Sequence, residues 1–282
     1  MPSLDGILAS WESGTLSSPL ALMEMLVVTK DYQEVERFLA NGAAGTKDAR
    51  HDDLRRMLVD NGHGCRQVAG ILRHDAPLRD LSDVRALFDR AALECEEASV
   101  ALYSLGSAKI LESATDEIVR FLEEEGVLGA GRKVLDVGCG IGRFEMALSS
   151  RVGSLVGVDL SPNMVAVARR RTSGLGNVRI ELGDGLELAR RDGEFDLALA
   201  IDSMPYLVGL GDEVLDANFA EIARVLRRGG DFVILEFSYR ENLDADRRDL
   251  SILADRFGFE VVVNGSSPFA LWSGRAFRLR RR

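Results

Sequence analysis

The sequence predicts an α/β protein with an all-α N-terminal part, and two observations carry this prediction. Up to about residue 125, apolar residues recur at helical spacing, whereas from Lys133 onward short apolar runs alternate with helical runs. Alternating strands and helices are typical of a mostly parallel sheet covered on both faces. We therefore expect a helical domain over residues 1–112 and an α/β domain over residues 113–282.

The N-terminal part is predicted to be helical throughout. In "SSPLALMEMLVVT", Ser18 can cap a helix and Pro19 suits the first helical position. A long helix is predicted over "DLSDVRALFDRAALECEEASVALYSLG". A further helix, "SATDEIVRFLEEEG", should end at Gly126 because glycine readily adopts the left-handed conformation that closes a helix.

The C-terminal part contains seven candidate strands. They are residues 133–138, 154–160, 178–184, 195–202, 231–237, 259–264 and 274–281. Only "GSSPFALWS" separates the last two, so we expect them to form an antiparallel hairpin at the edge of the sheet. The basic end "RAFRLRRR" fits a last strand in which Phe277 and Leu279 face inward and the arginines face solvent.

Composition and charge exclude several classes of protein. The net charge is −10, and all the excess acid lies in residues 1–130, which hold 13 Lys and Arg against 23 Asp and Glu. A generic nucleic-acid binder would need a basic footprint instead, so nucleic acid is not a favoured partner. No apolar run is long enough to span a membrane, and no signal peptide is recognised. Three scattered cysteines favour a reducing, cytoplasmic location.

The glycine-rich stretch "VLDVGCGIGRFEMAL" follows the first predicted strand. Its spacing is G-x-G-x-G, with Arg143 where a dinucleotide fingerprint has its third glycine, and no Gly-Lys-Ser/Thr follows to make a phosphate-binding P-loop. Asp136 precedes the glycines and places a carboxylate beside the ligand. This carboxylate would repel a pyrophosphate and attract a cation.

Two more acids end the next two predicted strands. Asp159 lies 19 residues after Gly140, the distance expected of a carboxylate that accepts hydrogen bonds from ribose hydroxyls. After it, Ser161 can cap a helix and Met164 can pack on an adenine. Asp184 follows the third strand, where it can reach an exocyclic amino group. Three acids at three strand ends indicate a ligand with an amine, a ribose and an adenine.

These motifs, in this order, resemble those of class I S-adenosylmethionine-dependent methyltransferases. The segments that carry the resemblance are "VLDVGCGIGR", "VGVDLSPNM", "GDG", "FDLALAID" and "RVLRRGG". The resemblance implies a Rossmann-like, seven-stranded sheet with the antiparallel hairpin strand, S-adenosyl-L-methionine as cofactor and S-adenosyl-L-homocysteine as product. It also implies a set of cofactor contacts: Asp136, Gly138, Cys139 and Gly140 at the methionine end, Asp159 and Leu160 at the ribose, and Met164, Gly183, Asp184, Gly185 and Ile201 around the adenine and cofactor.

The stretch "AIDSMPYL" after the fourth strand is the predicted place of the chemistry. Methyl transfer is an in-line displacement that needs alignment and, for a hydroxyl or protonated amine, a base. Asp202 and Tyr206 are the candidates, with structural roles as the alternatives. "SMPY" departs from the D/N/S-P-P-Y/F/W motif of enzymes that methylate amino groups of DNA bases or of protein glutamine, because Met204 replaces the first proline. This favours an oxygen or nitrogen atom of a small metabolite as acceptor.

The N-terminal helices are expected to form a lid and much of the substrate pocket. Tyr103, in "SVALYSLGSAKI", is a candidate for contact with the cofactor or substrate, with core packing as the alternative. The set His51, His63, Cys65 and His74 matches no usual zinc spacing, so no metal is expected. The alternatives to a small-molecule enzyme are a methyltransferase acting on protein or nucleic acid and a non-catalytic, cofactor-binding scaffold. A monomer or homodimer is expected, with no membrane partner.

Overall fold

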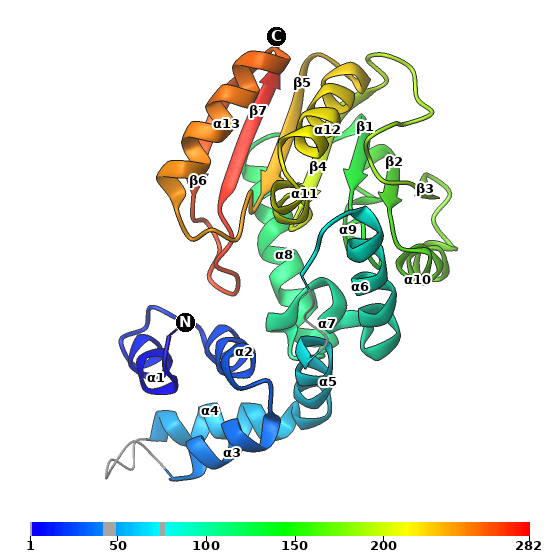
Figure 1. The fold of residues 1–282 in the computed structure, drawn as a ribbon. Helices are drawn as coiled ribbons and strands as arrows, with labels where there is room; N and C mark the ends of the chain where they lie inside the picture. The colour runs from blue at the N-terminus through cyan, green and yellow to red at the C-terminus, as the bar shows by residue number, and fades with distance from the viewer. Residues whose placement is uncertain (1, 42–48, 74–76) are drawn as a thin grey trace. The chain divides into compact units, whose positions relative to one another are not determined.

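The computed structural model describes residues 2–41, 49–73 and 77–282, and the chain divides into two compact units (Figure 1). Unit 1 comprises Met1–Ala76, Arg90–Ala114 and Ala270–Ser273, and unit 2 comprises Pro77–Asp89, Thr115–Phe269 and Gly274–Arg282. The chain therefore passes several times between the units. One passage lies at residues 114–115, close to the boundary predicted between residues 112 and 113.

The first part of the chain is helical in all the segments that the structure describes. Its elements are α1 (Leu4–Glu12), α2 (Ser18–Thr29), α3 (Tyr32–Asn41), α4 (Ala49–Asp60), α5 (Gly62–Arg73), α6 (Leu81–Glu94), α7 (Glu96–Val100), the 3-10 turn η1 (Leu102–Ser104) and α8 (Ala108–Glu124). The prediction of one long helix after residue 80 was wrong, because Cys95 and Ala101 are extended, with φ of −161° and −164°. The N-cap of α2 is Ser17, one residue before the predicted Ser18.

Unit 2 is built on a seven-stranded sheet in the order β3-β2-β1-β4-β5-β7-β6. Its strands are β1 (Gly129–Val137), β2 (Val152–Asp159), β3 (Val178–Leu182), β4 (Phe195–Ile201), β5 (Leu226–Leu235), β6 (Phe259–Ser266) and β7 (Ala276–Arg281). Neighbouring strands from β3 to β5 are parallel, and β7 is antiparallel to both β5 and β6. The predicted sheet with its C-terminal antiparallel strand is therefore confirmed.

Helices cover the sheet of unit 2. They are α9 (Arg143–Leu148), α10 (Pro162–Thr172), α11 (Met204–Leu210), α12 (Asp212–Val225) and α13 (Leu243–Phe257). Helices α11, α12 and α13 share one apolar core with strands β1, β4, β5 and β7, and α10 packs against β2 and β3 (Figure 1). Because β4 and the second half of β5 are buried, their apolar runs are nearly continuous, and polar residues appear where these strands end. The polar side chains at these strand ends therefore lie together at the carboxyl ends of the parallel strands.

The last strand follows its predicted pattern in part. Phe277 and Leu279 are fully buried, as predicted, but Arg278 is buried as well, with only 8% of its surface exposed. The Arg278 guanidinium donates to the buried Asp231 carboxylate at 2.9 Å, and this ion pair, not solvent, neutralises it. The sequence pattern could not reveal that partner, which is 47 residues away.

Candidate functional site

The glycine loop between β1 and α9 is held open by three left-handed residues. Gly138, Gly140 and Gly142 have φ of +80°, +55° and +77°, a region that side-chain-bearing residues rarely adopt. Two backbone N–H groups of the loop, those of Gly138 and Cys139, donate to the Val158 carbonyl of β2. The loop is thereby fixed against the neighbouring strand, and it opens at the carboxyl ends of β1 and β2.

Asp159, at the end of β2, is oriented by the glycine loop itself. Its carboxylate accepts the N–H of Gly140 at 2.8 Å and the N–H of Ser161 at 2.9 Å. The Ser161 hydroxyl caps α10 by accepting the N–H of Met164 and in turn donates to Asp89 at 2.5 Å. Burial raises the pKa of Asp159 to about 6, and its two backbone hydrogen bonds oppose that shift. Asp159 is therefore held in a fixed position next to Gly140, as the spacing of 19 residues predicts.

Asp136 ends β1 beneath the loop and is almost fully buried, with 1% exposure. Among the residues that the structure describes, the only hydrogen-bonding neighbour of its carboxyl group is another buried carboxyl group, that of Glu145. Burial is the main cause that raises its pKa, to about 7, while the positive charge of Arg143 opposes the shift. A buried, unsatisfied carboxyl group beside an open glycine loop fits a cationic group of a ligand.

The predicted adenine side is formed by the residues after β3. Gly183 donates its N–H to the Asp159 carbonyl at 3.0 Å, which ties the end of β3 to the end of β2. Gly185 has φ of +72° and lies against Val137, so this loop also requires glycine. The Asp184 side chain is exposed and accepts the N–H of Leu186 at 2.9 Å.

The remaining predicted cofactor residues have two kinds of environment. Met164 and Ile201 are buried at 1% and 6% exposure, and Leu160 is half-buried. Cys139 is buried, and burial raises its pKa well above the ordinary thiol value, so it remains a thiol at neutral pH. That protonation state does not suit a nucleophile.

The two catalytic candidates after β4 lie in one cluster with a residue that sequence reasoning missed. Asp202 accepts a hydrogen bond from the Tyr239 hydroxyl at 2.8 Å. The ring of Tyr206 meets the ring of Tyr239 edge-on at 5.8 Å and the ring of Phe88 at 4.9 Å. Tyr239 is 57% exposed, so the cluster has a solvent-facing side. Asp202 and Tyr206 are therefore brought together, and Tyr239 joins them.

The strand ends that carry this cluster are strained. Asp202 after β4 and Glu236 after β5 both have left-handed backbones, with φ of +59° and +64°. Burial raises the pKa of Asp202 to about 6, against the opposing effect of the Tyr239 hydrogen bond, and raises the pKa of Glu236 to about 7. Strained residues with raised carboxyl pKa values are enriched at functional sites. No sequence motif singled out Glu236 or Tyr239.

The loop and the strained strand end are in direct contact. The Ser203 hydroxyl donates to the Val137 carbonyl at 2.7 Å, and a Cβ added to Gly138 would lie 2.5 Å from the Cβ of Ser203. The glycine loop at Gly138 and the segment that carries Asp202 and Ser203 therefore lie side by side.

Tyr103 and the histidines belong to other surroundings. Tyr103 lies in unit 1, is 3% exposed, and its ring is 6.5 Å from that of Trp272 in the same unit. Its predicted contact with the cofactor and the predicted lid role of the N-terminal helices stay predictions. Within the described ranges no three His, Cys, Asp or Glu side chains gather as a metal site would require. His74 lies outside the described residues.

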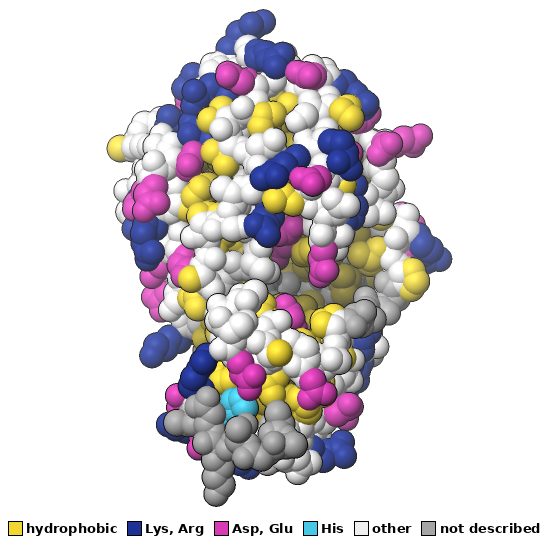
Figure 2. Space-filling view, turned by 90° about the vertical axis from the view of Figure 1, so that its left-hand side faces the viewer, with side chains coloured by type: hydrophobic (Ala, Val, Ile, Leu, Met, Phe, Trp, Pro, Cys, Tyr) yellow, Lys and Arg dark blue, Asp and Glu magenta, His cyan; other side chains and the backbone are white. Residues whose placement is uncertain are grey.

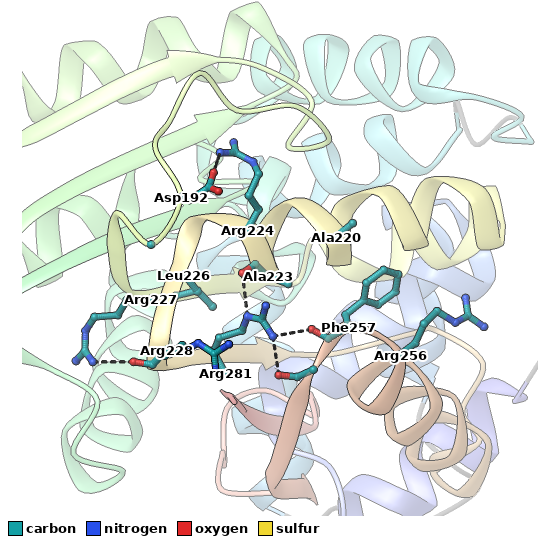
Figure 3. A pocket seen from close by; sticks show the side chains of 12 residues that line it. Asp192, Ala220, Ala223, Arg224, Leu226, Arg227, Arg228, Arg256, Phe257 and Arg281 are labelled. Carbon is teal, nitrogen blue, oxygen red and sulfur yellow. Dashed lines mark hydrogen bonds and ion pairs between the residues drawn. The ribbon is translucent and has the colours of Figure 1, made fainter.

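A separate hollow of about 800 Å³ opens at the amino ends of the parallel strands (Figure 3). Its arginines are Arg224, Arg227, Arg228, Arg256 and Arg281. Arg224 pairs with Asp192, while Arg281 donates to the carbonyls of Ala223 and Phe257, where α12 and α13 end. These guanidinium groups close helix ends and balance nearby acids. On the face in Figure 2, basic and acidic side chains likewise lie side by side.

The sheet order, the glycine loop and the acids at successive strand ends define the class I S-adenosylmethionine-dependent methyltransferase fold. Residues 134–230 match the model of a methyltransferase domain. The solved structure of magnesium protoporphyrin IX methyltransferase from Synechocystis is similar in fold, with a TM-score of 0.54 and 18% identity over 74% of this chain and all of that one.

Two curated relatives each match a little under half of the chain. Methyltransferase GfsG of Streptomyces halstedii is 37% identical over 138 residues, which is 48% of each protein. A demethylmenaquinone methyltransferase of Staphylococcus aureus is 38% identical over 126 residues, 42% of this chain and 48% of that protein. The matched region thus spans about half the length of these curated relatives. None of the helices in the described part of the chain has the length and apolar character that crossing a bilayer requires.

Proposed function

We propose that the protein is an S-adenosyl-L-methionine-dependent methyltransferase that transfers a methyl group to an oxygen or nitrogen atom of a small molecule. The observation that carries the proposal is the pairing of the unsatisfied, buried Asp136 with the loop-anchored Asp159 on either side of Gly140. A cationic amino-acid end beside the first carboxyl group and a ribose beside the second match this cofactor.

The chain's own residues would hold the cofactor along the carboxyl edge of the sheet. Asp136 and the Gly138–Gly140 backbone would receive its methionine end, and Asp159 would accept the ribose hydroxyls. Asp184, Gly185 and Met164 would border the adenine. The bound cofactor supplies an electrophilic methyl group, and the protein's remaining tasks are to align the acceptor and to take up its proton.

Asp202 is the proposed base for that proton. With a pKa of about 6 it is mostly ionised at neutral pH and yet more basic than an ordinary aspartate. Tyr239 fixes the carboxylate by donating to Oδ1, and Tyr206 adds an aromatic wall. The aromatic rings favour a small, partly apolar acceptor. By their names, the curated relatives include an enzyme that acts on demethylmenaquinone, a small molecule, which supports the same substrate class.

Binding of S-adenosyl-L-homocysteine to the purified protein, measured by titration calorimetry, tests the cofactor part. Asp159→Ala should weaken binding by about 2–3 kcal/mol, or roughly 30- to 150-fold, because charge-assisted hydrogen bonds to the ribose are lost. Asp212→Ala, a change at an exposed residue of α12, should leave affinity unchanged. Equal affinities for the wild-type protein and Asp159→Ala would contradict the placement of the ribose.

The acceptor class is tested separately. The protein is incubated with cofactor labelled in its methyl group and with cell extract, which is then divided into low-molecular-weight, protein and nucleic-acid fractions. Label in the low-molecular-weight fraction is the expected result. Label confined to protein or nucleic acid would replace this proposal with a macromolecular substrate, and cofactor binding without any transfer would favour a non-catalytic scaffold.

A further inference from the structure

A second carboxyl group lies against Asp136, and the proposed function assigns no role to it. Glu145, in the first turn of α9, has no exposed surface. Like the oxygens of Asp136, its two oxygens have no other hydrogen-bond partner in the described part of the chain. Space for it exists because residue 157 on β2 is glycine: a Cβ there would overlap Glu145 Oε1. Glu145 is therefore built into the floor of the site.

Asp136 and Glu145 lie within hydrogen-bonding reach of each other. An ionised carboxylate only accepts hydrogen bonds, so a bond between these two groups requires a proton on one of them. Two buried carboxylates side by side cannot both ionise at low cost. The contact and the absence of other partners are thus explained together by a shared proton.

The charged groups around Asp136 and Glu145 influence how strongly the pair holds its protons. Arg143, at the start of α9, is the positive group that faces it, while Asp159 at the end of β2 and the Cys139 thiol in the glycine loop are the other titratable neighbours. Burial, followed by the charge of Asp136, raises the pKa of Glu145 well above its ordinary value. The raised pKa of Glu145 favours a proton on this carboxyl group.

We propose that Glu145 is a second carboxyl group of the cofactor site, that it shares protons with Asp136 in the free protein, and that binding of the cofactor's ammonium group releases to solvent the proton that Asp136 holds. This inference rests on the proposed function. The ammonium group takes the place of the departing proton as the partner of Asp136, and Glu145 retains its own proton to donate to the same carboxylate. No bond other than the O–H bond of the carboxyl group breaks.

The coupling has a calculable size. With the pKa of Asp136 at about 7, about half a proton is released per bound ligand at pH 7, and affinity rises about tenfold from pH 6 to pH 8. The Asp159 carboxyl group, with its pKa of about 6, adds about twofold over the same range. The Asp136–Glu145 contribution is thus the larger of the two.

The experiment is calorimetric titration of the whole protein with S-adenosyl-L-homocysteine at pH 7 in buffers with different heats of ionisation. The slope of the observed heat against the buffer's heat of ionisation gives the number of protons released. In Glu145→Gln the amide can donate the hydrogen bond that the protonated carboxyl group donates, so proton release and its pH dependence should match the wild type. In Glu145→Leu that donor is lost, so the pKa of Asp136 should rise further, proton release at pH 7 should increase from about half toward one proton per ligand, and binding at pH 7 should weaken. Glu213→Gln, at an exposed residue of α12, is the matched control and should behave as wild type.

The outcomes separate the inference from the function on which it rests. Ligand binding without proton release in the wild-type protein, or equal release in Glu145→Leu, overturns the role of Glu145 and leaves the proposed function standing. No binding at any pH overturns both. If Glu145→Leu does not fold, the pH dependence of the wild-type affinity decides: a change below about threefold from pH 6 to pH 8 refutes the release of a proton from the pair.

Discussion

Gly138→Ala is the substitution for which the structure allows the sharpest prediction. The residue has φ of +80°, and an added Cβ would lie 2.5 Å from the Cβ and 3.1 Å from the hydroxyl oxygen of Ser203. Ser203 cannot move away freely, because its hydroxyl donates to the Val137 carbonyl at 2.7 Å. Alanine at this position therefore combines backbone strain with a steric overlap.

The two effects have separate magnitudes. A left-handed backbone costs an alanine about 1–2 kcal/mol relative to glycine. The overlap with Ser203 forces a local shift of the kind that costs about 1–3 kcal/mol in a packed region. Gly138→Ala should therefore lower the free energy of unfolding by about 2–5 kcal/mol, and it should weaken cofactor binding because the loop must move.

A double-mutant cycle with Ser203→Gly tests this division. Removing the serine side chain eliminates the overlap and leaves the backbone strain, so Gly138→Ala should cost only about 1–2 kcal/mol in that background. Urea unfolding of the four proteins measures the stabilities, and calorimetry measures their affinities for S-adenosyl-L-homocysteine. The reasoning is refuted if Gly138→Ala is equally costly in both backgrounds, or if it costs less than about 1 kcal/mol in the wild type.

Three further predictions concern the acids of the site. Asp184→Ala should weaken cofactor binding less than Asp159→Ala does, because Asp184 is exposed; a larger loss measured by calorimetry would reverse the predicted order. In Tyr239→Phe, loss of a hydrogen bond that lowers the pKa of Asp202 should move the acidic limb of the pH–rate profile to higher pH, with cofactor affinity unchanged; an unmoved limb would remove Asp202 as the base. Because the pKa values of Asp136 and Asp202 are raised to about 7 and about 6, the folded protein holds protons that the unfolded chain has lost. Their stabilising contribution is therefore lost as pH rises from about 4 to about 7, and urea unfolding of the ligand-free protein between pH 5 and pH 8 should show that decline.

The sequence predicted the sheet because its strands follow local rules, and the proposed cofactor residues are inferred from the same rules. Asp136, Asp159 and Asp184 each lie at or just after the carboxyl end of a strand, and the carboxyl ends of parallel strands meet at one edge of a sheet. The G-x-G-x-G spacing similarly predicts close backbone approach wherever it occurs. Such inferences need only the order of elements along the chain, so they hold without knowledge of side-chain contacts.

Other features depend on contacts that no local pattern records. In the sequence Glu145 looks like an ordinary polar residue of a helix. Only the glycine at residue 157 of β2 makes room for its side chain. Tyr239 comes after β5 in a segment without a motif, and its partner Asp202 is 37 residues away. The buried ion pair of Arg278 with Asp231 is hidden for the same reason. Long-range partners of polar groups are the part of a site that one sequence conceals.

Asp202 and Glu236, whose backbones are left-handed, combine a position at a strand end with a long-range contact that no local pattern records. Each follows one of two adjacent parallel strands, and the backbone N–H of Asp202 donates to the Leu235 carbonyl at the end of the neighbouring strand. A side chain in this conformation leaves the strand in a direction that a regular strand would not allow, at a cost of about 1–3 kcal/mol each. In Asp202 that strain places the carboxylate against Tyr239, and its neighbour Ser203 against the glycine loop. The strain is thus located where the proposed cofactor and acceptor meet, and the hairpin strand β7 stabilises it, because Glu236 accepts the backbone N–H of Arg275 just before that strand.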